Sequence, residues 1–279
     1  MTRPAFCNIG SHPRSGTTAL LLLLNSDPGV YISNEQNILG LAYEMLPWIT
    51  TQERRGEKAR ELIDRFGGNP ETGLIRAASR RENHTLAEIH RYCFSASSIR
   101  AIVRAIYEAH HTALQPEVEL KLYGDQMPAS AQWVDCMWKM PLDVKYIHMT
   151  RNPYDVANSI LRRNASAENG TDWWEDHPTV EQIMTLWNYA LDAGRAQHHR
   201  RDAIHVRYEE MMFERPAFVR RLEDFFGFQL DVDYPLVSDK SQHFEREYID
   251  DHTARYIEAQ TGWPRHVVWP DDRNLHERT

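Results

Sequence analysis

The sequence predicts an α/β protein whose parallel strands form one central sheet. The first observation is a short apolar segment over residues 4–10, followed by a glycine loop and a helix from Thr17 to about Asn25. A second apolar segment, Val30–Ile32, follows after the turn at Asp27-Pro28-Gly29. Strand, loop, helix and strand in this order are typical of two parallel strands joined by a crossover. The second observation is Val144–Met149, another apolar run that leads straight into a helical pattern.

The remaining elements keep the α/β order. Two further strands are expected over 118–123 and 203–206. Helices are expected over 129–140, 150–163, 180–199 and 216–226, the last ended by Gly227. Pro153 falls in the first turn of its helix, where a missing N–H costs nothing. We interpret the chain, 1–279, as a single domain with a mostly helical insertion at about 38–116 and a lid-like loop at about 164–178.

Composition and charge exclude several classes of protein. The chain has 279 residues, 42% of them hydrophobic, which is enough for a full core. Its formal net charge of -8 argues against nucleic acid or a membrane surface as a partner. The three cysteines, Cys7, Cys93 and Cys136, show neither a disulfide framework nor zinc-ligand spacing. The sequence shows no leader pattern and no apolar run long enough to span a membrane, so we expect a cytoplasmic protein.

The loop from Gly10 to Gly16 has the chemistry of an anion site. Backbone amides at a loop-to-helix junction point at one spot, and the helix dipole adds positive potential there. Gly16 permits close approach of the backbone, and Arg14 can neutralise charge bidentately. The hydroxyls of Thr17 and Thr18 can each donate a further hydrogen bond.

The same loop lacks the lysine that holds ATP in nucleotide triphosphatases. The Walker pattern places this lysine directly after its second glycine, and Thr17 stands there instead. We therefore expect a P-loop-like three-layer fold with a central parallel sheet and helical insertions, whose loop holds a phosphate group without a metal. The alternative is an ordinary helix start that is capped by a threonine.

A second candidate anion site follows the strand Val144–Met149. Arg151 leaves the carboxyl end of this strand, where ligands sit in open α/β sheets. Ser159 lies eight residues further on, about two helical turns away, so both side chains could hold a second phosphate. Taken singly, Arg151 is as well explained by a surface salt bridge and Ser159 by a hydroxyl inside a helix.

Three motifs in order resemble the sulfotransferase family that uses 3'-phosphoadenosine 5'-phosphosulfate (PAPS). They are PRSGTT over 13–18, RNPYDVANS over 151–159, and VRYEEM over 206–211 with FFGF over 225–228. The resemblance is closer to the branch of tyrosylprotein sulfotransferases and related bacterial enzymes than to the cytosolic steroid and phenol branch. Ala19 stands where the latter has a tryptophan, and its RKGxxGxW-type loop is missing.

The resemblance implies a role for each matching residue. The 5' end of the donor would contact the loop residues Arg14, Ser15, Gly16, Thr17 and Thr18. The 3'-phosphate would contact Arg151 and Ser159, and Tyr208 would lie near the adenine.

Glu35 falls without a gap on the catalytic glutamate of that branch. The order there is an RSGTT loop, an HPDV-like turn and the glutamate, and here RSGTT is followed by Asp27-Pro28-Gly29-Val30 and Asn34-Glu35. A carboxylate at a strand end that faces the donor can act as general base toward an acceptor hydroxyl. The alternative is a solvated loop charge or a carboxylate at a helix N-terminus.

One departure from the family concerns a positive charge. The branch has a lysine thought to stabilise the leaving group, and Gln126 stands in its place. An amide donates a hydrogen bond but supplies no full charge. Arg14 is the first candidate for the missing cation and Lys121 the second, while His12 inside the loop is an alternative acid or donor.

The resemblance implies in-line sulfuryl transfer from PAPS to a hydroxyl, with 3',5'-bisphosphoadenosine (PAP) as product and no metal. We expect a small metabolite or saccharide as acceptor, in a pocket built by 38–116 and 164–178. Aromatic side chains available for such a pocket are Trp133, Trp138, Trp173, Trp174 and Trp187. Core packing is the alternative, and we favour it for Trp133, Trp138 and Trp187. A non-catalytic PAP-binding protein and a P-loop kinase remain rival functions, and a homodimer stays open.

Overall fold

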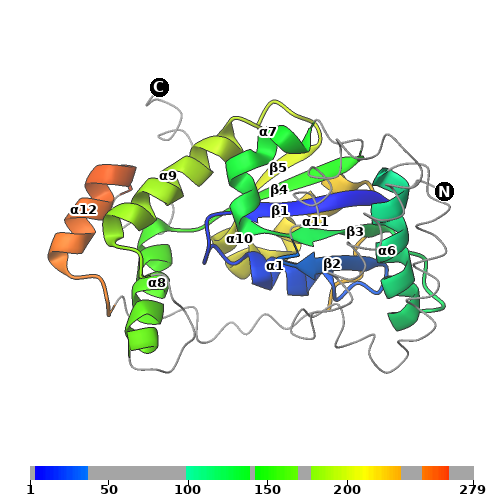
Figure 1. Cartoon of the computed structure of the whole chain (residues 1–279), viewed down its shortest axis with the longest axis horizontal. Helices are drawn as coiled ribbons and strands as arrows, with labels where there is room; N and C mark the ends of the chain where they lie inside the picture. The colour runs from blue at the N-terminus through cyan, green and yellow to red at the C-terminus, as the bar shows by residue number, and fades with distance from the viewer. Residues whose placement is uncertain (1–3, 37–98, 139–141, 169–176, 234–246, 264–279) are drawn as a thin grey trace, which may run out of the picture.

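A computed structural model describes residues 4–36, 99–138, 142–168, 177–233 and 247–263. Within these residues one parallel sheet has the strand order β2-β3-β1-β4-β5 (Figure 1). The strands are β1 (Ala5–Ser11), β2 (Val30–Asn34), β3 (Leu122–Gln126), β4 (Val144–Thr150) and β5 (Ala203–Arg207). The α/β prediction with a central parallel sheet is confirmed.

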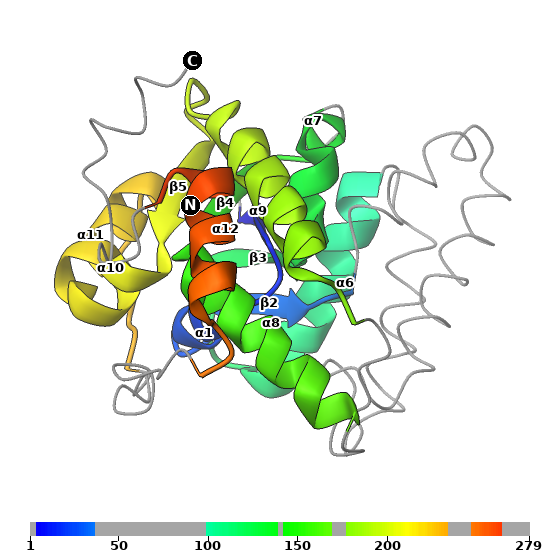
Figure 2. The same ribbon diagram turned by 90° about the vertical axis from the view of Figure 1, so that its left-hand side faces the viewer.

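Helices cover both faces of the sheet, so the fold has three layers. On one face lie α1 (Thr17–Leu24), α10 (Tyr208–Phe213) and α11 (Arg215–Phe226). The other face carries α6 (Ile99–Leu114), the 3-10 helix η2 (Pro128–Trp133), α7 (Val134–Met137) and α9 (Val180–Arg195). Figure 2 shows these two layers on either side of the strands.

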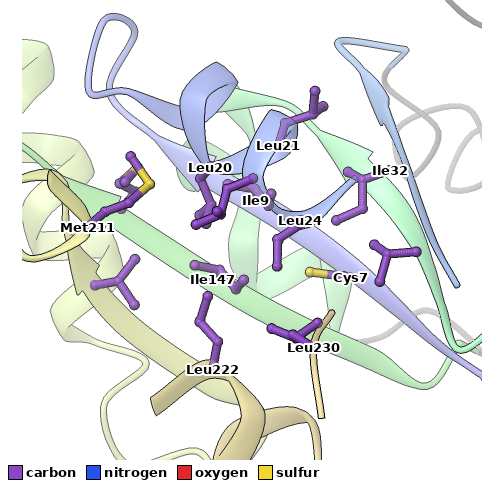
Figure 3. Packing of buried hydrophobic residues seen from close by; sticks show 14 of the residues in the cluster. Cys7, Ile9, Leu20, Leu21, Leu24, Ile32, Ile147, Met211, Leu222 and Leu230 are labelled. Atoms are coloured by element: carbon purple, nitrogen blue, oxygen red, sulfur yellow. The ribbon is translucent and has the colours of Figure 1, made fainter. Parts of the chain in front are cut away.

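The larger core cluster lies between the sheet and α1, α10 and α11. Four of the five leucines that end α1 are buried, and only Leu22 is exposed. Figure 3 shows Leu20 and Leu24 beside Ile9 of β1 and Ile147 of β4, with Leu222 of α11 below them. Burial of such side chains, worth about 2 kcal/mol each, holds α1 against the sheet.

A second cluster joins α8 (Pro153–Glu168), α9 and α12 (Asp251–Thr261) at the carboxyl edge of the sheet. It is centred on Tyr154 and Trp187, and Trp263 stacks edge-on against Trp187 at 5.8 Å. The Tyr154 hydroxyl donates to the main-chain oxygen of Trp263 (2.8 Å). The three helices lie toward the left in Figure 1, beyond the ends of β1 and β4.

Several predicted boundaries were wrong. Strand β3 starts at Leu122 rather than at 118, and it continues through Gly124 and Asp125. Asp125 is tolerated in a buried strand because it accepts hydrogen bonds from the Ser33 hydroxyl (2.7 Å) and the Gln36 amide (3.1 Å). Gly124 is required there, because a Cβ would lie 1.8 Å from the Cys7 oxygen.

The lid-like loop expected over 164–178 is wrong in its first part, because α8 runs on to Glu168. Residues 169–176 lie outside the described part of the chain, as do 38–98 of the expected helical insertion, of which α6 is described. The helix expected over 180–199 ends at Arg195, and that over 129–140 is divided between η2 and α7. The single-domain interpretation stays a prediction. In the described ranges, every helix is too short or too polar to cross a bilayer.

Candidate active site

The glycine loop joins β1 to α1 in a conformation that needs its glycine. Arg14 and Gly16 both have positive φ, 69° and 92°. A Cβ on residue 16 would lie 2.1 Å from Cδ2 of Tyr208, so the Tyr208 ring lies directly on the loop backbone. Gly16 is the N-cap of α1 and no side chain caps the helix, so the expected alternative of a threonine-capped helix start is wrong.

The loop presents hydroxyl groups that the described part of the protein does not use up. Ser15 is buried, and its Oγ has no hydrogen-bond partner among the described residues. The Thr17 Oγ1 accepts a hydrogen bond from Gln126 Nε2 (2.8 Å), which leaves its own proton to be donated. Thr18 is exposed. Buried hydroxyls beside a helix N-terminus suit an anionic ligand, because an unmade buried hydrogen bond is costly.

Arg151 and Tyr208 form a stack over the loop. The Arg151 guanidinium carbon lies 4.4 Å from the centroid of the Tyr208 ring, within cation–π range. Arg151 Nη1 also donates to the main-chain oxygen of Arg14 (3.3 Å). The ring of Tyr208 therefore lies between Gly16 and Arg151, and it connects motifs from β1, β4 and β5.

The backbone around Arg151 is held from two sides. Trp187 Nε1 donates to the main-chain oxygen of Arg151 (3.1 Å), and Glu209 accepts from the Asn152 amide (2.9 Å). Burial raises the pKa of Glu209 to about 7, although its hydrogen bonds and the nearby Arg151 charge act in the opposite direction. Sequence reasoning missed Glu209, whose only signal is its place directly after Tyr208.

Arg14 meets Ser159. Its Nε donates to the Ser159 Oγ (3.1 Å), so the loop and α8 are joined at this point. Ser159 thus contacts the side chain of Arg14, and Arg151 contacts the main chain of the same residue. The two residues expected to share a phosphate are brought to one place, with Arg14 in contact with both.

Most of the expected site residues line one pocket of about 440 Å³. Among its lining residues are Arg14, Gly16, Thr17, Thr18, Glu35, Arg151 and Tyr208, whereas Ser15 and Ser159 lie just outside. Glu35 follows β2 with a positive φ of 55°, and its amide donates to the main-chain oxygen of Gln126 (2.7 Å). The structure thereby brings the expected base and the expected donor loop to the same pocket.

A larger cavity of about 710 Å³ lies beside this pocket, against α8 and α9. The two share Pro13, Arg14 and Arg163. Sequence reasoning missed Arg163, which lies one helical turn beyond Ser159 in α8. The remaining lining residues are His12, Ile160, His177, Pro178, Glu181, Gln182, Ile183, Thr185 and Leu186.

His12 lies at the mouth of the loop as a neutral imidazole. Its Nδ1 contacts the Pro13 carbonyl oxygen (2.6 Å), which can only accept, so Nδ1 carries the proton. Burial lowers the pKa of His12 to about 4. The Nδ1 proton is used in this contact, and the role of acid or donor expected for His12 stays a prediction.

The expectation for Lys121 fails, whereas the core packing that we favour for Trp138 and Trp187 is confirmed. Lys121 directly precedes β3 and pairs with Asp27 (3.2 Å), whereas Gln126 is the last residue of β3. Lys121 therefore lies at the opposite end of this strand and does not replace the lysine. Trp187 is core, and Trp138 bonds Gln197 under the Arg200 guanidinium, so packing explains both. Trp173 and Trp174 lie outside the described residues, and so does the side chain of Trp133.

Fold and site define an α/β protein whose glycine loop joins β1 to α1 and lacks the Walker lysine. The model of the sulfotransferase family matches residues 7–232, and the chain belongs to this family, whose members transfer sulfuryl groups. No curated protein sequence matches the chain significantly.

Two solved structures are similar to the chain over nearly its full length. The sulfotransferase domain of the olefin synthase from Synechococcus PCC 7002 is 21% identical with a TM-score of 0.55, over 99% of this chain and 95% of that one. The sulfotransferase domain from the curacin biosynthetic pathway is 15% identical with a TM-score of 0.52, over 100% and 98%. Both similarities bear on the fold.

Proposed function

We propose that the protein transfers a sulfuryl group from PAPS to a hydroxyl of a small molecule. The observation that carries this proposal is the pocket of about 440 Å³, where Arg14, Arg151, the loop threonines and Glu35 converge. Two guanidinium groups suit a ligand with two anionic ends, and a carboxylate beside them suits proton removal.

The residues present fit the donor. The buried Ser15 hydroxyl without a described partner, the α1 N-terminus and the positive φ of Gly16 support binding of the 5'-phosphosulfate. Arg151 and Ser159, joined through Arg14, support binding of the 3'-phosphate. Tyr208 offers a ring face for the adenine in the same pocket. PAPS would supply an activated sulfuryl group.

In this mechanism Glu35 accepts the proton of the acceptor hydroxyl while the hydroxyl oxygen forms a bond to sulfur. The bond between sulfur and the bridging phosphate oxygen breaks, and PAP leaves. Arg14 and the loop amides stabilise the negative charge that builds on the bridging and sulfuryl oxygens. Positioning of the two substrates supplies much of the rate, as it does in phosphoryl transfer.

The acceptor is proposed to occupy the cavity against α8 and α9. This cavity adjoins the donor pocket at Pro13 and Arg14, and its volume of about 710 Å³ suits a small molecule. Ile160, Ile183 and Leu186 offer an apolar wall, while Glu181 and Gln182 offer polar contacts. A small hydroxylated metabolite or saccharide is the proposed class.

The proposal is tested by calorimetry with PAP and by transfer of labelled sulfate from PAPS to a panel of hydroxyl compounds. Binding of PAP with transfer to at least one acceptor, unaffected by a chelator, is the expected result. Binding without transfer to any acceptor would favour the rival PAP-binding protein, for which the neutral Gln126 is the argument. Magnesium-dependent turnover of ATP would favour the kinase.

A further inference from the structure

Gln126 lies where the donor loop and the candidate base meet. It is the last residue of β3, and it is paired with Ile9 of β1 on one side and with Asn34 of β2 on the other. Its side chain is fully buried, 0% exposed. A buried amide needs hydrogen-bond partners, so the partners of Gln126 indicate its role.

Gln126 contacts both halves of the proposed chemistry. Its Nε2 donates to Thr17 Oγ1 (2.8 Å), and its main-chain oxygen accepts from the Glu35 amide (2.7 Å). Its Oε1 has no hydrogen-bond partner among the described residues. The bond to Thr17 is therefore the one side-chain hydrogen bond that Gln126 makes within the described ranges.

We propose that Gln126 is a positioning residue that orients the hydroxyl of Thr17 as a donor toward the bound sulfate donor. This inference rests on the proposed function. A hydroxyl has one proton and two lone pairs, and the amide N–H occupies one lone pair. The amide nitrogen accepts nothing, so the proton of Thr17 points away from Gln126.

The direction of this hydrogen bond matters for the reaction. Thr17 is 3% exposed and lines the donor pocket, so its proton is directed to the loop where the anion binds. A hydroxyl that already accepts a hydrogen bond is polarised and donates more strongly. Gln126 thus stabilises developing charge through Thr17, in place of the full charge that the family lysine supplies.

The first variant to test is Gln126→Met, which keeps the length of the side chain and loses the amide donor. We expect kcat for sulfate transfer to fall about tenfold, less than for removal of a direct oxyanion donor. The affinity for PAP should fall as well, by up to about tenfold, because the charge that builds on the bridging oxygen remains on the 5'-phosphate of PAP. A merely structural role would lower the melting temperature and leave kcat per folded enzyme unchanged.

The second measurement is a double-mutant cycle with Thr17→Val, which removes the hydroxyl and keeps the shape. If Gln126 acts through Thr17, Gln126→Met lowers kcat by less than about twofold in the Thr17→Val background. An equal loss in both backgrounds, or no loss in the native one, overturns the inference. Asn8→Leu is the matched control for stability, because it removes a buried amide-to-hydroxyl hydrogen bond (2.7 Å, to Ser130) and Asn8 lines neither the donor pocket nor the larger cavity. Its kcat should stay within about twofold of the native value.

Gln126→Glu tests the direction of the hydrogen bond. An ionised carboxylate only accepts, so it would draw the Thr17 proton toward itself, and we expect less activity than in Gln126→Met. Native activity in Gln126→Glu, measured above the pH at which the new carboxyl ionises, would mean that Thr17 donates to residue 126, which refutes the inference. If the native protein binds no PAP, the proposed function fails and this inference with it. If the native protein binds PAP and transfers sulfate while the cycle is additive, only this inference fails.

Discussion

Gly16→Ala is expected to damage the donor pocket through a ring that is far away in sequence. The new Cβ would lie 2.1 Å from Cδ2 and 2.6 Å from Cε2 of Tyr208, so the ring must move. The Arg151 guanidinium carbon lies 4.4 Å from the centroid of the same ring, and it loses this cation–π contact when the ring moves. One methyl group therefore disturbs the loop and the second anion site together.

The magnitude follows from two contributions. Alanine at a φ of 92° costs about 1–2 kcal/mol relative to glycine. Loss of the contact between Arg151 and Tyr208 adds roughly 0.5–2 kcal/mol. The free energy of unfolding should thus fall by about 1.5–4 kcal/mol. Binding of PAP should weaken at least about tenfold, which corresponds to roughly 1.4 kcal/mol.

Gly227→Ala is the matched control, because Gly227 has a similar φ of 79° and a Cβ there meets nothing within 4 Å. Urea unfolding should show a loss of about 1–2 kcal/mol for this control, with unchanged PAP affinity by calorimetry. If Gly16→Ala bound PAP as tightly as Gly227→Ala does, the Tyr208 ring would not support the donor site, and the reasoning would be wrong.

Three further predictions concern single side chains. Glu35→Gln should lower kcat by about 100-fold or more with PAP affinity retained, and native turnover would remove Glu35 from the mechanism. Arg151→Met should weaken PAP at least about tenfold in calorimetry, whereas equal affinity would contradict its role at the 3'-phosphate. The pKa of Glu209 is raised to about 7, so the folded protein holds a proton that the unfolded chain releases. The free energy of unfolding should accordingly decrease as the pH rises from about 4.5 to 7, by up to about 3 kcal/mol, and urea titrations of Glu209→Gln should show a flatter profile. Identical profiles for both proteins would refute this assignment.

The sequence was informative where local chemistry and fold agree. The leucine run of α1, the apolar strand β4 and the glycine that ends α11 were each predicted with nearly the right bounds. Gly227 adopts the left-handed conformation of a helix C-cap, as its place after the amphipathic pattern indicates. At these positions the neighbours in sequence and the neighbours in space favour the same conformation.

The wrong predictions concern residues whose conformation depends on contacts with residues distant in sequence. Polar residues argued against a strand over 124–126, but Asp125 and Gln126 are each bonded to groups from other strands or from α1. Periodicity within β3 gives no sign of Ser33 or Thr17, so the strand was ended at Tyr123 instead of Gln126. The alternation over 118–123 also placed its start four residues too early. Gln126 itself was noticed only as the residue that replaces a lysine. Its side-chain partner Thr17 is 109 residues away in sequence, and its main-chain partner Glu35 is a neighbour only across the sheet.

The position of the two outer strands has a consequence for folding and for ligand binding. Glu35 directly follows β2 and Tyr208 directly follows β5, and these two strands are the opposite edges of the sheet that the described residues form. Edge strands fray first, because each is paired on one side only. A ligand that contacts both Glu35 and Tyr208 binds only protein molecules in which β2 and β5 are both paired with the sheet. Its binding energy therefore opposes fraying of each of these strands. Amide hydrogen exchange should therefore slow in β2 and β5 together when the donor pocket is filled, although the two strands never touch.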